Sequence, residues 1–221
     1  MITEKLYLLM ANDAEKPESV VSATGYGMNA ALISDLMIAG RVALSDDQQR
    51  QIQLVGAGPC PDPVLAAPLA KLEKKERLSL DEAVKISGLC DARLVTDSLA
   101  KAGIVEYGER TLLGMGKKRV HIINEQIQRQ IRTDLQAALH GQKIPGVSDT
   151  TVLAIVQAIG LAPELLKDEI APMAAGEAQA RIKELAQDSP VADSAQRAVA
   201  AMNAAITTQR VIPPVSGKGD G

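Results

Sequence analysis

A stretch near the middle of the chain combines positive charge with apolar side chains. Residues 110–119 contain four cations and no acid, and three large apolar residues lie between the cations. The cations are Arg110, Lys117, Lys118 and Arg119, and the apolar residues are Leu112, Leu113 and Met115. Such a stretch suits the headgroup layer of an anionic bilayer, where each nearby Lys or Arg contributes about 1 kcal/mol. Alternatively, the apolar residues pack on the core or on a second subunit while the cations are solvated. The spacing alone favours this second interpretation.

The residues that usually carry catalysis or bind metals are few and scattered. The only thiols are Cys60 and Cys90, the only imidazoles are His121 and His140, and their spacing fits no zinc-finger pattern. The sequence has no nucleophile elbow, no Walker loop and no His-Glu-x-x-His motif. The Gly-Ala-Gly at 56–58 precedes Pro-Cys-Pro rather than the start of a helix, so a dinucleotide fingerprint fails. We therefore expect a non-enzymatic protein without a metal or cofactor.

The composition is that of a folded, slightly acidic protein with few aromatic residues. Its 221 residues are 46% hydrophobic and 23% charged, the net charge is −3, and three Tyr are the only aromatic side chains. A surface-wide nucleic-acid footprint and a base-stacking platform are therefore not expected. The longest apolar stretch, 152–166, contains Gln, Gly, Pro and Glu, which prevent a continuous membrane-spanning helix. Since the first residues also lack a signal-peptide pattern, we expect a cytoplasmic protein, peripherally associated with membranes.

Apolar periodicity and capping signals predict a mainly helical chain with one β-hairpin near its middle. Thr3 is placed to cap the first helix. We expect helices over residues 2–10, 27–41, 64–75, 79–86, 91–103, 124–139, 149–159, 163–170, 174–187 and 194–208. Extended segments are predicted at 42–44 and 48–55, and strands of the hairpin at 104–107, 110–115 and 120–123. The Gly- and Pro-rich tail over 211–221 is predicted to be disordered.

The order of elements in 78–123 is similar to a winged helix, with two short helices, a glycine and a hairpin. The second helix would be the recognition helix. Its charged residues are Asp91, Arg93, Asp97 and Lys101, and their charges sum to zero. A helix that enters the major groove usually presents Arg, Lys, Gln or Asn to the base edges. Nucleic acid is therefore not the expected partner, although a winged-helix regulator stays open as an alternative.

Four stretches, in order along the chain, resemble the Golgi phosphoprotein 3 family. They are ITEKLYLL at 2–9, LISDLMIAGRVAL at 32–44, the segment 94–105 that ends LAKAGIV, and TTVLAIV at 150–156. The composition suggests a bacterial member. The resemblance implies a mainly α, single globular domain over 1–210, in which amphipathic helices wrap a central helical bundle and one β-hairpin protrudes.

Eukaryotic members of this family are peripheral membrane proteins that bind phosphatidylinositol 4-phosphate and help to retain glycosyltransferases. The family's headgroup pocket uses one Trp and three Arg, and the resemblance aligns these four positions with Val20, Asn29, Leu89 and Ala92. Arg93 lies one residue beyond the last position and could substitute for it. The family's headgroup positions are therefore not matched in this sequence, and the resemblance carries over the fold better than the ligand.

Together these observations favour a peripheral protein that binds anionic phospholipid headgroups, by resemblance those of phosphatidylinositol 4-phosphate. We expect the headgroup contacts to come from Arg93 and from the cations Arg110, Lys117, Lys118 and Arg119. Leu112, Leu113 and Met115 would contact the membrane or form a homo-oligomer through the hairpin. One alternative is a protein–protein adaptor that has lost lipid binding, and the other is the winged-helix regulator.

Overall fold

Helices dominate the part of the chain that the computed structural model describes, which is residues 1–11, 18–45, 50–56, 58–108 and 120–187. The helices in these ranges are α1 (Ile2–Met10), α2 (Glu18–Ile38), α3 (Pro63–Leu72), α4 (Leu80–Val84), α5 (Ala92–Lys101), α6 (Glu125–Leu139), α7 (Val147–Ala158), α8 (Ala162–Leu165), α9 (Lys167–Ile170) and α10 (Ala175–Gln187). The strands are β1 (Val42–Leu44), β2 (Ile52–Leu54), β3 (Val105–Tyr107) and β4 (Val120–Ile122). The expected mainly α fold is confirmed.

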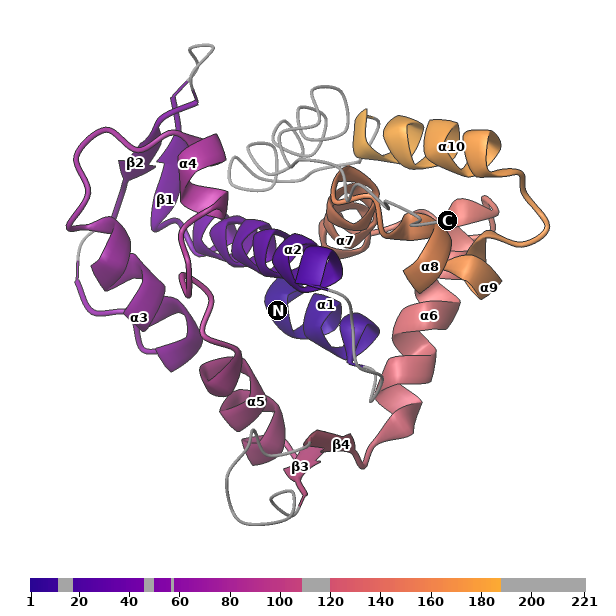
Figure 1. Cartoon of the computed structure of the whole chain (residues 1–221), viewed down its shortest axis with the longest axis horizontal. Helices are drawn as coiled ribbons and strands as arrows, with labels where there is room; N and C mark the ends of the chain where they lie inside the picture. Colours follow the sequence, from indigo (N-terminus) through magenta and orange to yellow (C-terminus); the bar gives the residue numbers. More distant parts are fainter. Residues whose placement is uncertain (12–17, 46–49, 57, 109–119, 188–221) are drawn as a thin grey trace.

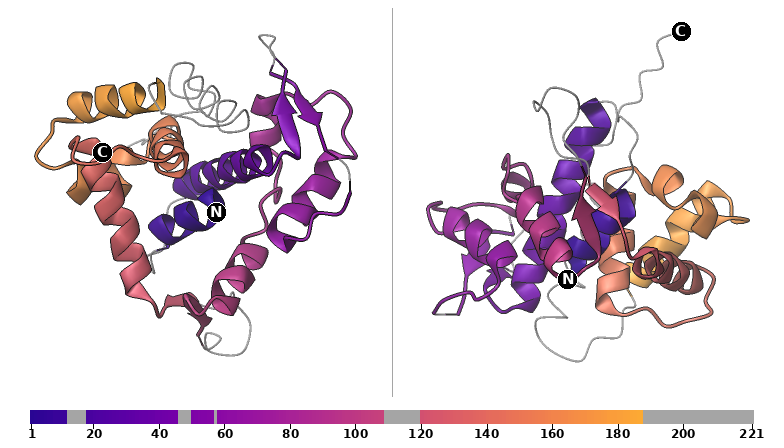
Figure 2. Two further views of the ribbon diagram at one scale, coloured as in Figure 1. Left: turned by 180° about the vertical axis from the view of Figure 1, so that it is seen from behind. Right: turned by 90° about the horizontal axis from the view of Figure 1, so that it is seen from below.

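The core lies where α1, α2 and α7 pack together at the centre of the molecule (Figure 1). In α7, the five residues from Val152 to Val156 have no exposed surface, because α1, α2, α6 and α10 all pack against this helix. The helices α3, α4 and α5 line one side of this centre, and α6, α8, α9 and α10 line the other (Figures 1 and 2). This is the central bundle, wrapped by amphipathic helices, that the resemblance implies.

The start of α2 differs from the sequence prediction. The helix runs without interruption from Glu18, whereas the sequence pattern predicts its start at residue 27. Gly27 lies inside the helix, and a Cβ atom added there would lie 3.0 Å from Ile159 Cδ1 and 3.3 Å from Ile155 Cγ2. The glycine therefore serves a close approach to the end of α7 and does not mark a helix boundary.

The first turn of α1 is capped by a side chain from α2. The buried Asp35 carboxylate accepts two backbone hydrogen bonds, from the Ile2 N–H to Oδ1 at 2.9 Å and from the Thr3 N–H to Oδ2 at 2.8 Å. The Thr3 hydroxyl also donates to Oδ2, at 2.6 Å. Thr3 lies within α1, so its predicted role as the cap is wrong. Burial raises the pKa of the Asp35 carboxyl, while the hydrogen bonds from Thr3 and Ile2 oppose this shift.

A turn with a left-handed glycine ends α2 and leads into the first strand pair. Gly40 has a φ of +63°, and Arg41 then donates to the carbonyl oxygens of Gly58 at 2.6 Å and Pro59 at 3.3 Å. The guanidinium group therefore holds the loop before α3 against the end of α2. In the resembling stretch 32–44, this Gly-Arg pair has a structural role.

Both strand pairs are antiparallel and each has three residue pairs. Val105 pairs with Ile122 and Tyr107 with Val120, which confirms the predicted strand at 120–123. The second pair, β1 with β2, forms where the sequence suggested extended segments. The predicted strand at 110–115, the predicted helix at 194–208 and the tail at 211–221 lie outside the described residues. Within the described ranges, no helix is both long and apolar enough to cross a membrane.

Candidate functional site

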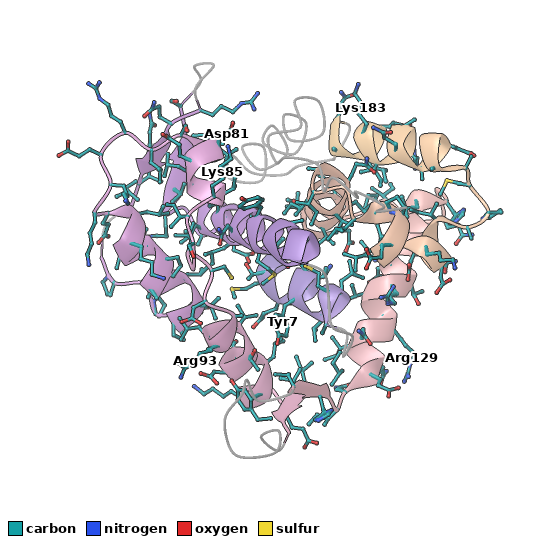
Figure 3. All side chains as sticks on the ribbon, in the orientation of Figure 1. Tyr7, Asp81, Lys85, Arg93, Arg129 and Lys183 are labelled. Carbon is teal, nitrogen blue, oxygen red and sulfur yellow. The ribbon has the colours of Figure 1, made fainter. Side chains whose placement is uncertain are left out.

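The candidate site lies at the end of the molecule that α5 and the β3–β4 pair form (Figure 1). Arg93 is on the first turn of α5, is exposed, and lies on the outer side of the helix (Figure 3). Tyr107 at the end of β3 is 39% exposed, and Ile123 directly after β4 is 53% exposed. An exposed tyrosine and an exposed isoleucine thus stand before and after the segment 109–119 in sequence.

A hydrogen bond attaches the hairpin to α5. The Tyr107 hydroxyl donates to the Asp97 carboxylate, and this bond raises the pKa of Tyr107 to about 12, with Arg93 opposing the shift. The amide of Arg93 donates to the Asp91 carboxylate at 2.9 Å, which caps α5. The exposed face of α5 therefore alternates between positive and negative groups, as the sequence predicts, and offers no strongly basic surface.

The position that the resemblance assigns to a headgroup arginine is occupied by a structural asparagine. Asn29 is 5% exposed, and its amide nitrogen donates to the carbonyl oxygens of Val84 at 2.8 Å and Ile86 at 2.9 Å. Its amide oxygen accepts the Cys90 N–H at 2.9 Å. Asn29 therefore ties α2 to the turn between α4 and α5, residues 85–91.

The other aligned positions differ in exposure and chemistry. Leu89 has no exposed surface, and Ala92 is exposed but has only a methyl group. The side chain of Val20 lies outside the described part of α2. From α3, the Lys71 ammonium group donates to the Gly88 carbonyl, so a second side chain holds the same turn. The structure thus brings Asn29, Leu89 and Ala92 to one place without a cationic side chain from any of them.

The remaining candidate residues are in the segment that the structure does not describe. They are Arg110, Leu112, Leu113, Met115, Lys117, Lys118 and Arg119. The described strands fix only where this segment begins and ends, which is at the end of the molecule that carries Arg93 (Figure 3). Their contact with a membrane or a second subunit stays a prediction.

The thiols and imidazoles occupy separate environments. Burial raises the pKa of Cys90 to about 12, with Asp91 and Asp35 adding to the effect and Lys71 opposing it. His140 Nε2 lies 3.0 Å from the Glu169 carbonyl oxygen on the opposite side of the molecule. Across the described ranges, no three His, Cys, Asp or Glu residues are arranged to hold a metal ion.

Sequence reasoning missed two cavities near α10. The larger, about 570 Å³, lies between the end of α6 and α10, where its charged lining residues are Arg181, Glu177 and Glu184. The smaller, about 330 Å³, is mainly apolar and contains Lys167 as its charged residue. The acidic residues of α10 mark a solvated helix face in the sequence, and nothing in their spacing indicates a cavity.

Sequence reasoning also missed the roles of Asn29 and Lys71. The signal for Asn29 was available, because it is a polar residue within an otherwise apolar part of α2. Such a residue, once buried, must find hydrogen-bond partners elsewhere in the fold. Lys71 gave no such signal, since it lies in a mixed run of lysines and glutamates.

Comparison with known proteins identifies the family of this chain. A sequence model of the family described as Golgi phosphoprotein 3 (GPP34) matches residues 2–202, which include all four resembling stretches. A search of curated proteins finds no match. Because the family match covers most of the chain, the protein belongs to the Golgi phosphoprotein 3 family.

Proposed function

We propose that the protein is a non-enzymatic peripheral membrane protein that binds anionic phospholipid headgroups through the end formed by α5 and β3–β4. The family resemblance implies phosphatidylinositol 4-phosphate as the headgroup. The observation that carries the proposal is the exposure of Arg93, Tyr107 and Ile123, with the cationic segment 110–119 between the last two in sequence.

Physical chemistry supports this end of the molecule as a membrane contact. A tyrosine ring has an apolar body and a polar hydroxyl group, which suits the boundary between acyl chains and headgroups. Ile123 adds apolar surface, and the segment 110–119 adds a net charge of four from sequence alone. Apolar contact combined with electrostatic attraction is the usual basis of peripheral binding to anionic lipids.

Flotation with vesicles tests this proposal. The triple variant Lys117→Glu/Lys118→Glu/Arg119→Glu reverses three cations, and at about 1 kcal/mol for each cation it should weaken binding at least about 100-fold. The matched control is Lys74→Glu/Lys75→Glu/Arg77→Glu, which makes the same charge change on exposed residues after α3.

The control should retain most of the binding, because its residues lie away from the α5 and β3–β4 end. Equal losses in the two variants would mean that net charge alone governs binding. No difference between neutral and anionic vesicles at low salt would refute the proposal.

Exposed apolar side chains at the same end also suit a second function, that of an adaptor that dimerises through the hairpin. Tyr107 and Ile123 would then pack in a symmetric seam together with Leu112 and Leu113. Light scattering of the unmodified protein and of Leu112→Asp/Leu113→Asp separates the two functions. A dimer that the variant converts to a monomer would favour the adaptor, and a monomer in both cases would favour the membrane contact.

A further inference from the structure

We propose that the smaller of the two cavities near α10 binds an aliphatic monocarboxylate, a fatty acid of medium chain length. The cavity lies between the end of α7, the short helices α8 and α9, and the start of α10 (Figures 1 and 2), and its volume is about 330 Å³. It is separate from the end of the molecule formed by α5 and β3–β4. The proposal therefore goes beyond the proposed function and does not depend on it.

The floor of this cavity is apolar and consists mainly of small side chains. Ala162, Ile170 and Ala178 line it and are buried, whereas Pro163 and Pro172 line it and are exposed, which places them at the rim. The described lining residues include no aromatic ring, so they offer aliphatic contact and no stacking surface. A hydrocarbon chain suits such a lining, because every methylene group placed there leaves water.

Gln157 adds an amide group to the wall of the cavity. It directly follows the fully buried residues 152–156 of α7 and is itself half-buried. A polar group that is partly withdrawn from water usually has a hydrogen-bond partner. Asn29 in α2 follows this rule, since both of its N–H donors are taken by backbone carbonyls. The Gln157 side chain has no such partner within the described ranges, so its two N–H groups are available to a ligand oxygen.

Lys167 supplies the positive charge of the cavity. It is the first residue of α9, and its ammonium group has no ion-pair partner among the described residues. The buried acid of the same helix, Glu169, is already paired with Arg132 at 2.8 Å. The exposed Asp168 does not line the cavity. Because an apolar surrounding screens charge less than water does, this ammonium group favours an anionic ligand.

Charge and volume together define the ligand. A carboxylate can accept hydrogen bonds from the Lys167 ammonium group and the Gln157 amide at once, while an attached hydrocarbon chain covers the apolar floor. At about 30 Å³ for each non-hydrogen atom, the cavity holds roughly eleven such atoms, which is about the size of octanoate. A cavity with a mainly apolar lining and a few polar groups is the usual form of a small-molecule site.

The larger cavity near α10 has a different character. Arg181 is engaged there, because it lies 2.8 Å from Glu184 and also donates to backbone carbonyls at the end of α6. Glu177 adds a second acid to the lining. A carboxylate would therefore be repelled from the larger cavity, which leaves the smaller one as the site for this ligand.

Isothermal titration calorimetry of the full chain tests the proposal with butanoate, hexanoate, octanoate, decanoate and octylammonium. Affinity should rise about fourfold for each added methylene group up to octanoate and then level off, because the cavity is full. Octanoate should bind at least about tenfold more tightly than octylammonium, which has the same chain and the opposite charge. Equal affinities for these two ligands, or no binding of octanoate, would overturn the proposal.

A charge variant locates the bound carboxylate. Lys167→Met should weaken octanoate binding about tenfold, because it removes the charge and keeps most of the side-chain volume. Lys183→Met is the matched control, since Lys183 is an exposed lysine of α10 that does not line the cavity (Figure 3). Lys167→Glu should reverse the preference and favour octylammonium. An unchanged octanoate affinity in Lys167→Met would overturn the proposal.

A second pair of variants locates the hydrocarbon chain. Ala175 is an exposed residue that lines the cavity, so Ala175→Leu should reduce the volume without disturbing the core. The gain in affinity from hexanoate to octanoate should then disappear. Ala180→Leu makes the same change at an exposed position of α10 outside this cavity and should keep that gain. The same dependence on chain length in both variants would mean that the chain lies elsewhere and would overturn the proposal.

Discussion

Asp35 should be one of the strongest single contributors to the stability of the fold, although it is a buried carboxyl group. In Asp35→Ala, the amides of Ile2 and Thr3 lose their acceptor, and both residues are almost completely buried. Each buried amide without a partner costs about 1–3 kcal/mol. Because the substitution also relieves the burial of a charge, we expect the free energy of unfolding to fall by about 2–4 kcal/mol.

Two further variants test whether the loss of stability comes from the hydrogen-bond acceptors of Asp35. Asp35→Asn keeps one carbonyl acceptor for one of the two amides, so it should cost about half as much, about 1–2 kcal/mol. Asp168→Ala removes an exposed acid from α9 and should change the free energy of unfolding by no more than about 0.5 kcal/mol. Urea unfolding followed by circular dichroism measures all three changes on one scale. If Asp35→Ala and Asp168→Ala lost the same stability, the α1 cap would not have the role assigned to it.

The pH dependence of the same position gives a second test. Burial raises the pKa of Asp35 above 3.8, so the folded protein binds this proton more tightly than the unfolded chain. The proton's contribution to stability is fully present below pH 3.8 and is lost as the pH rises through the folded pKa. Relative to Asp35→Asn, the unmodified protein should therefore lose stability across that interval. A gain across it would show that the hydrogen bonds outweigh the burial.

Three other perturbations have definite expected results. Arg132→Ala should destabilise the fold by about 3 kcal/mol in urea unfolding, because it leaves the buried Glu169 without its partner at 2.8 Å. Adding Glu169→Gln should restore part of this stability, and no restoration would contradict the pairing of Arg132 with Glu169. Lys5→Met should lower the free energy of unfolding by about 2 kcal/mol in the same assay, because the Asp149 side chain is 8% exposed and loses an ammonium group 2.5 Å away. A decrease below about 0.5 kcal/mol would mean that water compensates for the lost ion pair. Burial raises the pKa of Cys90 to about 12, so at pH 8 this thiol should react with iodoacetamide about 1,000-fold more slowly in the folded protein than in urea. Mass spectrometry measures both rates, and equal rates would show that the thiol is accessible and ionised in the folded protein.

The fold class could be predicted because apolar periodicity is a local property of the sequence. The buried faces of α5 and α6 repeat at helical spacing, and both helices form where the pattern places them. The start of α2 could not be predicted in this way. Gly27 is a poor helix former by propensity, and its packing against Ile155 and Ile159 becomes apparent only when α7 is in place.

Two buried polar residues of α2 show the same limit more clearly. Asp35 caps α1 across 32 positions in sequence, and Asn29 holds Cys90 across 61 positions. No spacing rule connects residues so far apart, so their partners follow from tertiary packing alone. The exposure of Arg93 was predictable from the polar face of α5. The negative charges of Asp91 and Asp97 on the same helix weaken its attraction for anions.

Hydrogen bonds hold together the elements that are ordered as in a winged helix, α5 and the β3–β4 pair. The Thr96 hydroxyl is hydrogen-bonded to the Tyr7 hydroxyl at 2.9 Å, and Ser98 donates to Glu4 at 2.7 Å, so α5 is fastened to α1 along its inner face. The Tyr107 hydroxyl then fastens β3 to α5. The inner face of α5 is thus held on α1, and the charges on its outer face are balanced. In this structure α5 connects α1 in the core to strand β3.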